Sequence, residues 1–166
     1  YNIQRLRKQL KTMGLLVITD AILNRVTQNW QKGKRTHIFI DEFHVVFENE
    51  ISGAFFNSAW RRFRKRNAYP TALTQNVEFL LDSVLASTML SNSEHIVMLN
   101  QAPRDRQRLA ELLAISEEQL GYITNAEPGS GLLRYGGTLI PFVNRFPKGK
   151  IYDQITTKPG EGGKFT

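Results

Sequence analysis

The chain has 166 residues, of which 41% are hydrophobic and 22% charged, and it contains no cysteine. This size and composition are those of a folded domain with a buried core, and they exclude a disordered chain, a disulfide framework and a thiolate metal site. A net charge of +7, from 22 basic and 15 acidic residues, favours an anionic partner such as a nucleotide, a nucleic acid or an acidic membrane surface.

The first half of the sequence predicts two strands among helices. Apolar residues recur at helical spacing from about residue 11 to residue 32, and Gly33 is expected to end that helix. The segment 36–40 is a continuous apolar run, typical of a buried parallel strand, and a helix-forming region follows to about residue 66. Pro70 is expected to start a second strand at 71–75, and Asn76 to cap a helix over 77–81.

The second half predicts further helices and then a change to β structure. A helix is expected over 84–90, a strand over 95–99, a helix opening at Pro103, and a capping box at Ser116. Short β-like segments follow at 131–135, 138–143 and 151–157. We therefore expect an α/β core over about residues 1–121, a β-rich appendage over about 122–158 and a flexible tail at 159–166.

Two adjacent carboxylates, Asp41 and Glu42, end the first predicted strand. The carboxyl ends of parallel strands open into the crevice where α/β sheets bind ligands. In P-loop NTPases an acidic residue at this place holds Mg²⁺, and another residue activates or orients the attacking water. The structural alternative is that Asp41 caps the following helix and Glu42 adds favourable charge to its first turn.

A phosphate-binding loop is missing from the sequence. The P-loop pattern needs Gly, four residues, then Gly-Lys and a Ser or Thr. Three Gly-Lys pairs occur, none with Gly five positions earlier or a hydroxyl residue afterwards: Gly33-Lys34, Gly149-Lys150 and Gly163-Lys164. Since the chain begins at Tyr1 without Met, we expect it to be a piece of a longer protein whose P-loop lies upstream.

Six short segments occur in an order that resembles one family: 33–36, 40–42, 74–78, 98–101, 140–142 and 156–159. Together they resemble the C-terminal ATPase domain of the VirB-type, TraC and TraE conjugation ATPases, the motors of type IV secretion, within the FtsK/HerA-like group. The resemblance implies a RecA-like P-loop NTPase core, three-layered with a mostly parallel sheet, truncated and followed by a C-terminal β appendage.

The resemblance also implies roles for individual residues. Asp41 and Glu42 would be the Walker B pair, Asp41 holding Mg²⁺ through water and Glu42 activating the attacking water. Gln75 would sense the γ-phosphate of ATP, and Arg64 would be an arginine finger reaching a neighbouring subunit's site. Four further basic residues crowd the same segment, Arg61, Arg62, Lys65 and Arg66.

The function implied is ATP hydrolysis that powers conjugative DNA transfer or assembly of the secretion machine. The partners implied are further copies of the parent protein, commonly a hexamer, and other secretion components at the inner membrane. No apolar run approaches the roughly 18 residues needed to span a bilayer, and no signal-peptide-like leader opens the sequence. These features predict a cytoplasmic protein, and the resemblance implies that it is peripheral to the inner face of the membrane.

Two other functions stay open. One is a DNA translocase or coupling protein of the same superfamily, with direct DNA contact. The other is a non-catalytic assembly module that keeps the fold. Phe56, Trp60 and Phe63 recur at helical spacing and predict a buried stripe, with the neighbouring cations as a solvated face. The histidines show no metal-ligand spacing and are expected to be structural, His44 and His95 among them.

Overall fold

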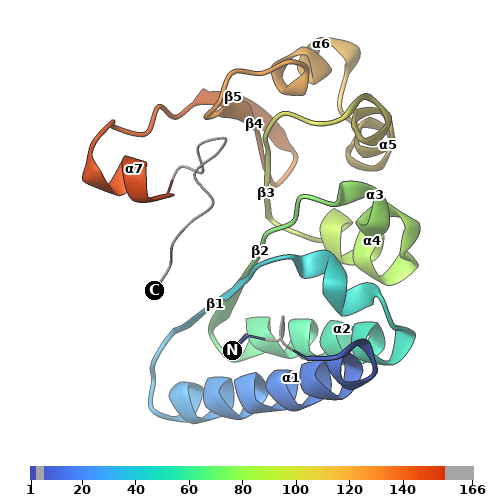
Figure 1. The fold of residues 1–166 in the computed structure, drawn as a ribbon, viewed down its shortest axis with the longest axis vertical. Helices are drawn as coiled ribbons and strands as arrows, with labels where there is room; N and C mark the ends of the chain where they lie inside the picture. The colour runs from blue at the N-terminus through green and yellow to red at the C-terminus, as the bar shows by residue number, and fades with distance from the viewer. Residues whose placement is uncertain (3–5, 156–166) are drawn as a thin grey trace. The chain divides into compact units, whose positions relative to one another are not determined.

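The computed structural model describes residues 1–2 and 6–155 (Figure 1). The chain divides into two compact units, residues 1–93 and 94–166. The first unit contains the predicted carboxylate pair and the basic segment, and the second begins just before the strand that was expected over 95–99. Each unit has its own small sheet.

The first unit alternates helices with two strands. Its elements are α1 (Lys8–Gln31), β1 (Thr36–Ile40), the 3₁₀ helix η1 (Phe43–Phe47), α2 (Glu50–Lys65), β2 (Ala68–Ala72), α3 (Val77–Asp82) and α4 (Val84–Ser91). Side chains cap three of the helices: Asn49 accepts from the amides that begin α2, Asn76 caps α3 and Ser83 caps α4.

Strands β1 and β2 pair in parallel, from Thr36 opposite Ala68 to Ile40 opposite Ala72. The residues on either side of β2 bond to β1: the Leu73 N–H donates to the Ile40 carbonyl oxygen, and the Asn67 carbonyl oxygen accepts from the Thr36 N–H. The odd-numbered residues of β2 therefore direct their backbone groups toward β1. Pro70 is even-numbered, and its nitrogen therefore faces the free edge. The missing N–H of Pro70 removes no hydrogen bond to β1.

The core of the first unit lies between α1, α2 and one face of this sheet. Val26, Ala59 and Phe63 are fully buried, and Ile38 is 8% exposed. The aromatic stripe of α2 is confirmed, with Phe56 and Phe63 buried and in edge contact. The opposite face of β1 carries Phe39, which is 74% exposed.

The second unit combines an antiparallel sheet with short helices. Its elements are β3 (His95–Met98), α5 (Pro103–Leu113), α6 (Glu117–Leu120), the 3₁₀ helix η2 (Gly121–Ile123), β4 (Ser130–Tyr135), β5 (Thr138–Val143) and α7 (Lys150–Ile155). Ser116 forms the predicted capping box with Gln119, and Pro103 occupies the first turn of α5.

The sheet of the second unit has the order β3-β4-β5. Ile96, Met98 and Leu132 point to one face and are buried there with Leu109 and Ile123. A Cβ at position 131 would collide with the Met98 carbonyl oxygen, so this close approach of β4 to β3 requires Gly131.

The expected sheet differs from the observed sheets. One mostly parallel sheet was predicted, but in the described residues only β1 and β2 are parallel, and β3 pairs antiparallel with β4. The fold is therefore a mixed α/β structure with two small sheets. The apolar run 95–98 predicted a strand, but such a run carries no information about which strand will be its partner.

One element boundary and one element type were also wrong. The second strand covers Ala68–Ala72 instead of 71–75, because Pro70 faces the free edge and does not delay the strand. The segment predicted as a strand over 151–157 is α7 over Lys150–Ile155. A helix satisfies its own backbone groups, whereas a lone strand needs a partner. Residues 156–157 and the predicted tail at 159–166 lie outside the described residues.

Candidate functional site

The carboxyl ends of β1 and β2 stay joined for several residues beyond the strands. The Leu73 N–H donates to the Ile40 carbonyl oxygen at 2.8 Å, and the Phe43 N–H donates to the Leu73 carbonyl oxygen at 2.8 Å. The residues between and after these bonds, Asp41-Glu42 and Thr74-Gln75, therefore emerge at the same edge of the sheet. This is the edge at which parallel α/β sheets bind ligands.

Asp41 is exposed and directly follows β1. Its Oδ1 accepts a hydrogen bond from the Glu42 N–H at 3.0 Å, which fixes the carboxylate against the turn. The residue at the start of η1 is Glu42, and no side chain caps that helix, so the capping alternative for Asp41 is not found. A carboxylate oxygen at a solvent-facing edge suits Mg²⁺, which is usually held by one or two carboxylates together with waters and phosphate oxygens.

Glu42 has a left-handed backbone, with φ 48° and ψ 49°. Left-handed backbone costs a residue with a Cβ roughly 1–2 kcal/mol, and such conformations cluster at functional sites. The bend turns the chain from β1 into η1, whose side chains Phe43, Val46 and Phe47 are buried. Burial of those apolar side chains offsets the cost of the bend and holds Glu42 at the strand end.

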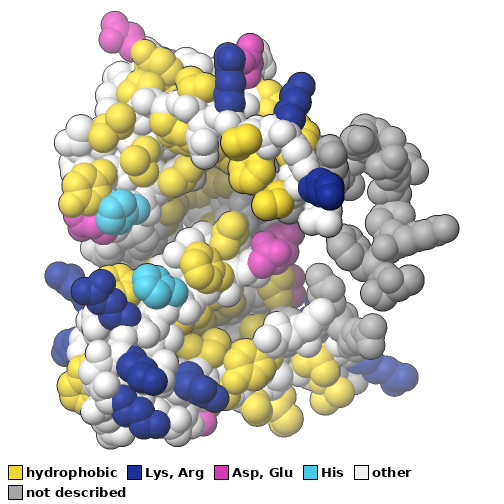
Figure 2. Space-filling model, turned by 90° about the vertical axis from the view of Figure 1, so that its left-hand side faces the viewer, with side chains coloured by type: hydrophobic (Ala, Val, Ile, Leu, Met, Phe, Trp, Pro, Cys, Tyr) yellow, Lys and Arg dark blue, Asp and Glu magenta, His cyan; other side chains and the backbone are white. Residues whose placement is uncertain are grey.

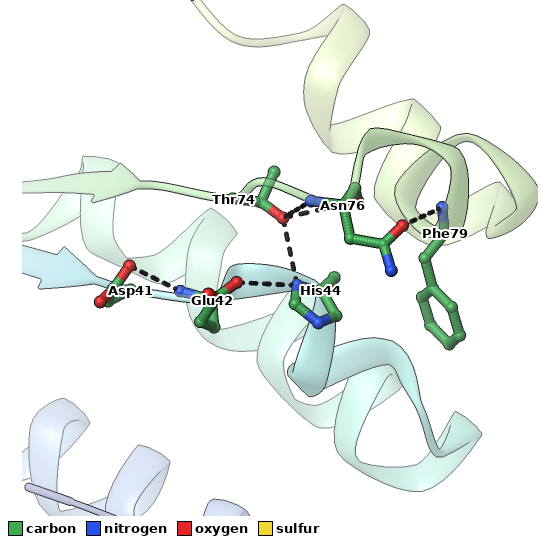
Figure 3. A network of polar contacts seen from close by, with 6 residues as sticks. All are labelled: Asp41, Glu42, His44, Thr74, Asn76 and Phe79. Atoms are coloured by element: carbon green, nitrogen blue, oxygen red, sulfur yellow. Dashed lines mark hydrogen bonds and ion pairs between the residues drawn. The ribbon is translucent and has the colours of Figure 1, made fainter. Parts of the chain in front are cut away.

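His44 joins the two loops of this edge (Figure 3). Its Nδ1 lies 3.3 Å from Glu42 Oε2 and 3.1 Å from Thr74 Oγ1. Thr74 Oγ1 also accepts from the Asn76 N–H at 3.1 Å, and Asn76 Oδ1 accepts from the Phe79 N–H at 3.2 Å. A continuous chain of polar contacts therefore runs from the Glu42 carboxylate to the start of α3.

Gln75 is exposed and lies three residues beyond the last residue of β2. Sequence reasoning expected it to end the strand, and the structure places it in the loop between Thr74 and Asn76 instead. Because both of its neighbours belong to the polar chain that begins at Glu42, the backbone on either side of Gln75 is held in place. Its amide thus emerges at the same edge as the carboxylate pair.

Arg64 lies at the other end of this sheet. It is exposed, in the last turn of α2, four residues before Ala68, which pairs with the first residue of β1. A five-residue strand is about 16 Å long, so Arg64 is remote from the Asp41 end of β1. The structure does not bring it together with Glu42 within one chain.

Other basic side chains surround Arg64. Figure 2 shows Lys and Arg side chains gathered over the region of α1 and α2. Between residues 32 and 65 the exposed basic residues are Lys32, Lys34, Arg35, Arg61, Arg62, Arg64 and Lys65. Arg66 differs from them: its guanidinium donates to Thr27 Oγ1 at 2.6 Å and ties α2 to α1. Arg66 is therefore structural, and we call the seven exposed residues the basic surface.

Two searches of the described part of the chain are negative. Among those residues no helix combines the length and apolar character required of a membrane span. In the same residues no three His, Asp or Glu side chains gather as a metal cluster.

Comparison with solved structures finds a similar fold. The structure of VirB4 of Thermoanaerobacter pseudethanolicus matches with a TM-score of 0.76 over 90% of this chain. The fold is that of a VirB4 segment. The two sequences are 21% identical, and the chain spans 41% of the length of that VirB4 chain. No protein-family model and no curated protein matches this chain.

The likeness to VirB4 agrees with the family resemblance in the sequence motifs. It covers nearly the whole chain and is a likeness of fold. The roles of Asp41, Glu42, Gln75 and Arg64 stay predictions.

Sequence reasoning missed the part played by His44 and Thr74. His44 was expected to be structural because no metal-ligand spacing includes it. The available signal was position: His44 is two residues after Glu42, and Thr74 directly precedes Gln75. Only the pairing of β1 with β2 brings the two loops together, so that Glu42 Oε2 and Thr74 Oγ1 both contact Nδ1 of His44.

Proposed function

We propose that the chain is part of an ATP-hydrolysing motor of type IV secretion, and that the carboxyl edge of β1 and β2 is one half of its nucleotide site. The observation that carries the proposal is the joint emergence of Asp41-Glu42 and Thr74-Gln75 at that edge in a VirB4-like fold. The second half of the site, a phosphate-binding loop, belongs to a part of the parent outside this sequence.

Each side chain has a role that follows from its chemistry. The Asp41 carboxylate would hold Mg²⁺ through a water, and the ion would supply neutralisation of the phosphate charge. The Glu42 carboxylate accepts a proton from the attacking water, which requires it to be ionised and within hydrogen-bond reach. The Gln75 amide donates a hydrogen bond to an oxygen of the γ-phosphate and so reports its presence to the loop.

Arg64 acts between subunits in this proposal. Since it lies at the opposite end of the sheet from Asp41, its guanidinium serves a neighbouring copy in an oligomer, of hexamer type, at the inner face of the membrane with other secretion components. An arginine supplied in this way stabilises charge in the transition state and can raise the rate by roughly 10³–10⁵-fold.

The deciding experiment compares the parent protein with its Glu42→Gln variant. Phosphate release from ATP should occur in the parent and stop in the variant, while nucleotide binding is retained. Glu111→Gln is the matched control, because Glu111 is exposed on α5 and its loss removes the same charge elsewhere. If Glu42→Gln hydrolyses ATP as fast as the parent, the Walker B assignment is wrong and a non-catalytic assembly module becomes the better explanation.

A second candidate function is a DNA translocase or coupling protein of the same superfamily. The basic surface favours it, because its seven exposed cations are suited to phosphate contacts. DNA binding by the parent that weakens steeply between low and high salt would support this function. Salt-independent or absent binding would leave the secretion motor as the only catalytic candidate.

A further inference from the structure

His44 stands between two loops that the proposed reaction must coordinate. Its side chain is 18% exposed, and the ring meets Phe79 edge-on with centroids 6.1 Å apart. This packing leaves Nδ1 directed at Glu42 Oε2 and Thr74 Oγ1, at 3.3 and 3.1 Å. In Figure 3 the ring lies between the two loops, and dashed lines run from it to both.

We propose that His44 is a positioning residue that couples the Glu42 carboxylate to the Thr74-Gln75 loop. The inference rests on the proposed function, because it assigns a partner to the proposed base. When the loop that carries Gln75 moves in response to nucleotide, the contact of Thr74 with His44 changes, and the hold of His44 on Glu42 changes with it.

The hydrogen-bonding capacity of one nitrogen explains the coupling. When Nδ1 carries a proton, it donates to the Glu42 carboxylate and shares that proton with Thr74 Oγ1. When Nδ1 carries a lone pair, it accepts from the Thr74 hydroxyl and repels the carboxylate. Thr74 Oγ1 accepts from the Asn76 N–H at 3.1 Å. Its own proton goes either to Nδ1, at 3.1 Å, or to the Asn76 carbonyl oxygen, at the longer distance of 3.5 Å. The position of Thr74 therefore affects whether Glu42 is held.

The competing explanation is that His44 merely packs against Phe79. Two substitutions separate the explanations. His44→Phe keeps an aromatic ring beside Phe79 and removes the nitrogen. His44→Asn removes the ring, but its amide nitrogen lies near the position of Nδ1 and can still donate to Glu42. A packing role predicts that the Phe variant is the more active, and a coupling role predicts that the Asn variant is.

The first test measures steady-state ATP hydrolysis by the parent protein. His44→Phe should lower kcat roughly 10- to 100-fold, the loss typical of a reacting group misplaced by about 1 Å, with KM for ATP nearly unchanged. His44→Asn should recover most of kcat. His37→Phe is the control, since His37 is exposed on β1 and its ring stacks on Tyr69; its kcat should match the parent's.

A double-mutant cycle tests the coupling itself. Thr74→Val should lower kcat in the parent and should have little further effect when combined with His44→Phe, because the two variants break the same connection. The proposal would be overturned if the losses in kcat were additive, or if His44→Phe had the kcat of the parent. The motor assignment would still stand if Glu42→Gln were inactive.

The second test needs no ATPase activity and uses the chain itself. Carbon-13 NMR of the Glu42 side-chain carboxyl should show a shift on Thr74→Val when His44 is present and none when His44 is replaced by Phe. If the proposed function fails, this measurement still decides whether the connection exists. If Thr74→Val leaves the Glu42 carboxyl resonance unchanged while His44 is present, the connection does not exist.

Discussion

At the scale of the residue, the carboxyl edge of β1 combines an exposed acid with a strained one. Asp41 is held by its contact with the Glu42 N–H, and Glu42 adopts a left-handed backbone. Neither arrangement is the helix cap that the sequence allowed as an alternative. The buried side chains of η1 keep the bend in place, so the chain maintains a costly conformation at the point where the proposed chemistry occurs.

Gln75 is the residue whose role is most directly testable at this scale. Gln75→Ala in the parent should lower kcat for ATP and also weaken ATP binding, because the variant loses the amide that donates to an oxygen of the γ-phosphate. Measured kcat and Kd for ATP check the expectation. Gln101→Ala, in the second unit, is the matched amide control, and equal losses in both variants would contradict the assignment.

Ala114 provides a stability prediction. It ends α5 with φ 54° and ψ 49°, a backbone that costs alanine energy and that glycine adopts freely. Ala114→Gly should therefore raise the free energy of unfolding by about 0.5–1 kcal/mol. Ala110→Gly, inside the same helix, should lower it by about 1 kcal/mol. Urea titration of both variants gives the comparison, and destabilisation by both would contradict the strain argument.

At the scale of the element, helical periodicity in α2 predicted the core of the first unit correctly. Phe63 is fully buried, while Phe39 on the open face of β1 is 74% exposed. Phe63→Ala should lower the free energy of unfolding by about 3–5 kcal/mol, because it leaves a cavity. Phe39→Ala should change it by less than about 0.5 kcal/mol. If denaturant titrations give the two variants similar losses in the free energy of unfolding, the face of β1 that carries Phe39 is covered.

The sequence predicted which segments form strands but not which strands pair with one another. The apolar runs at 36–40 and 95–99 were both predicted as strands and form β1 and β3, yet one pairs in parallel and the other antiparallel. Apolar residues, continuous or alternating with polar ones, indicate that a segment is buried. The strand that pairs with the segment is determined by contacts between residues far apart in the sequence. The same limit explains the error at α7, because the local sequence of a segment does not show whether another strand will pair with it.

At the scale of the whole molecule, the placement of Arg64 predicts that two inactive variants can complement each other. Glu42→Gln and Arg64→Ala should each abolish most ATP hydrolysis by the parent. Mixed and allowed to assemble, they should regain activity, because some interfaces then combine Glu42 of one subunit with Arg64 of the next. Phosphate release by the mixture measures this. Arg61→Ala is the control and should hydrolyse ATP normally alone; no recovery in the mixture would place the finger elsewhere.

The chain alone should not hydrolyse ATP. It carries the acidic pair and Gln75 but no Gly-x-x-x-x-Gly-Lys pattern to cradle the phosphates. Phosphate release at background level, beside an active parent, is the expected result. Turnover by the purified chain that Glu42→Gln abolishes would show that phosphates are bound by residues other than a P-loop.

The sequence by itself determined what depends on neighbours along the chain. The caps at Asn76 and Ser116, the buried stripe of α2 and the strand ending at Asp41-Glu42 follow from local spacing and composition, which act within a few residues. Only the tertiary structure decided that Thr74 meets His44, that Arg64 lies at the far end of the sheet and that β3 pairs with β4. These relations join residues distant in sequence, and the balance of packing and hydrogen bonding across the fold selects them.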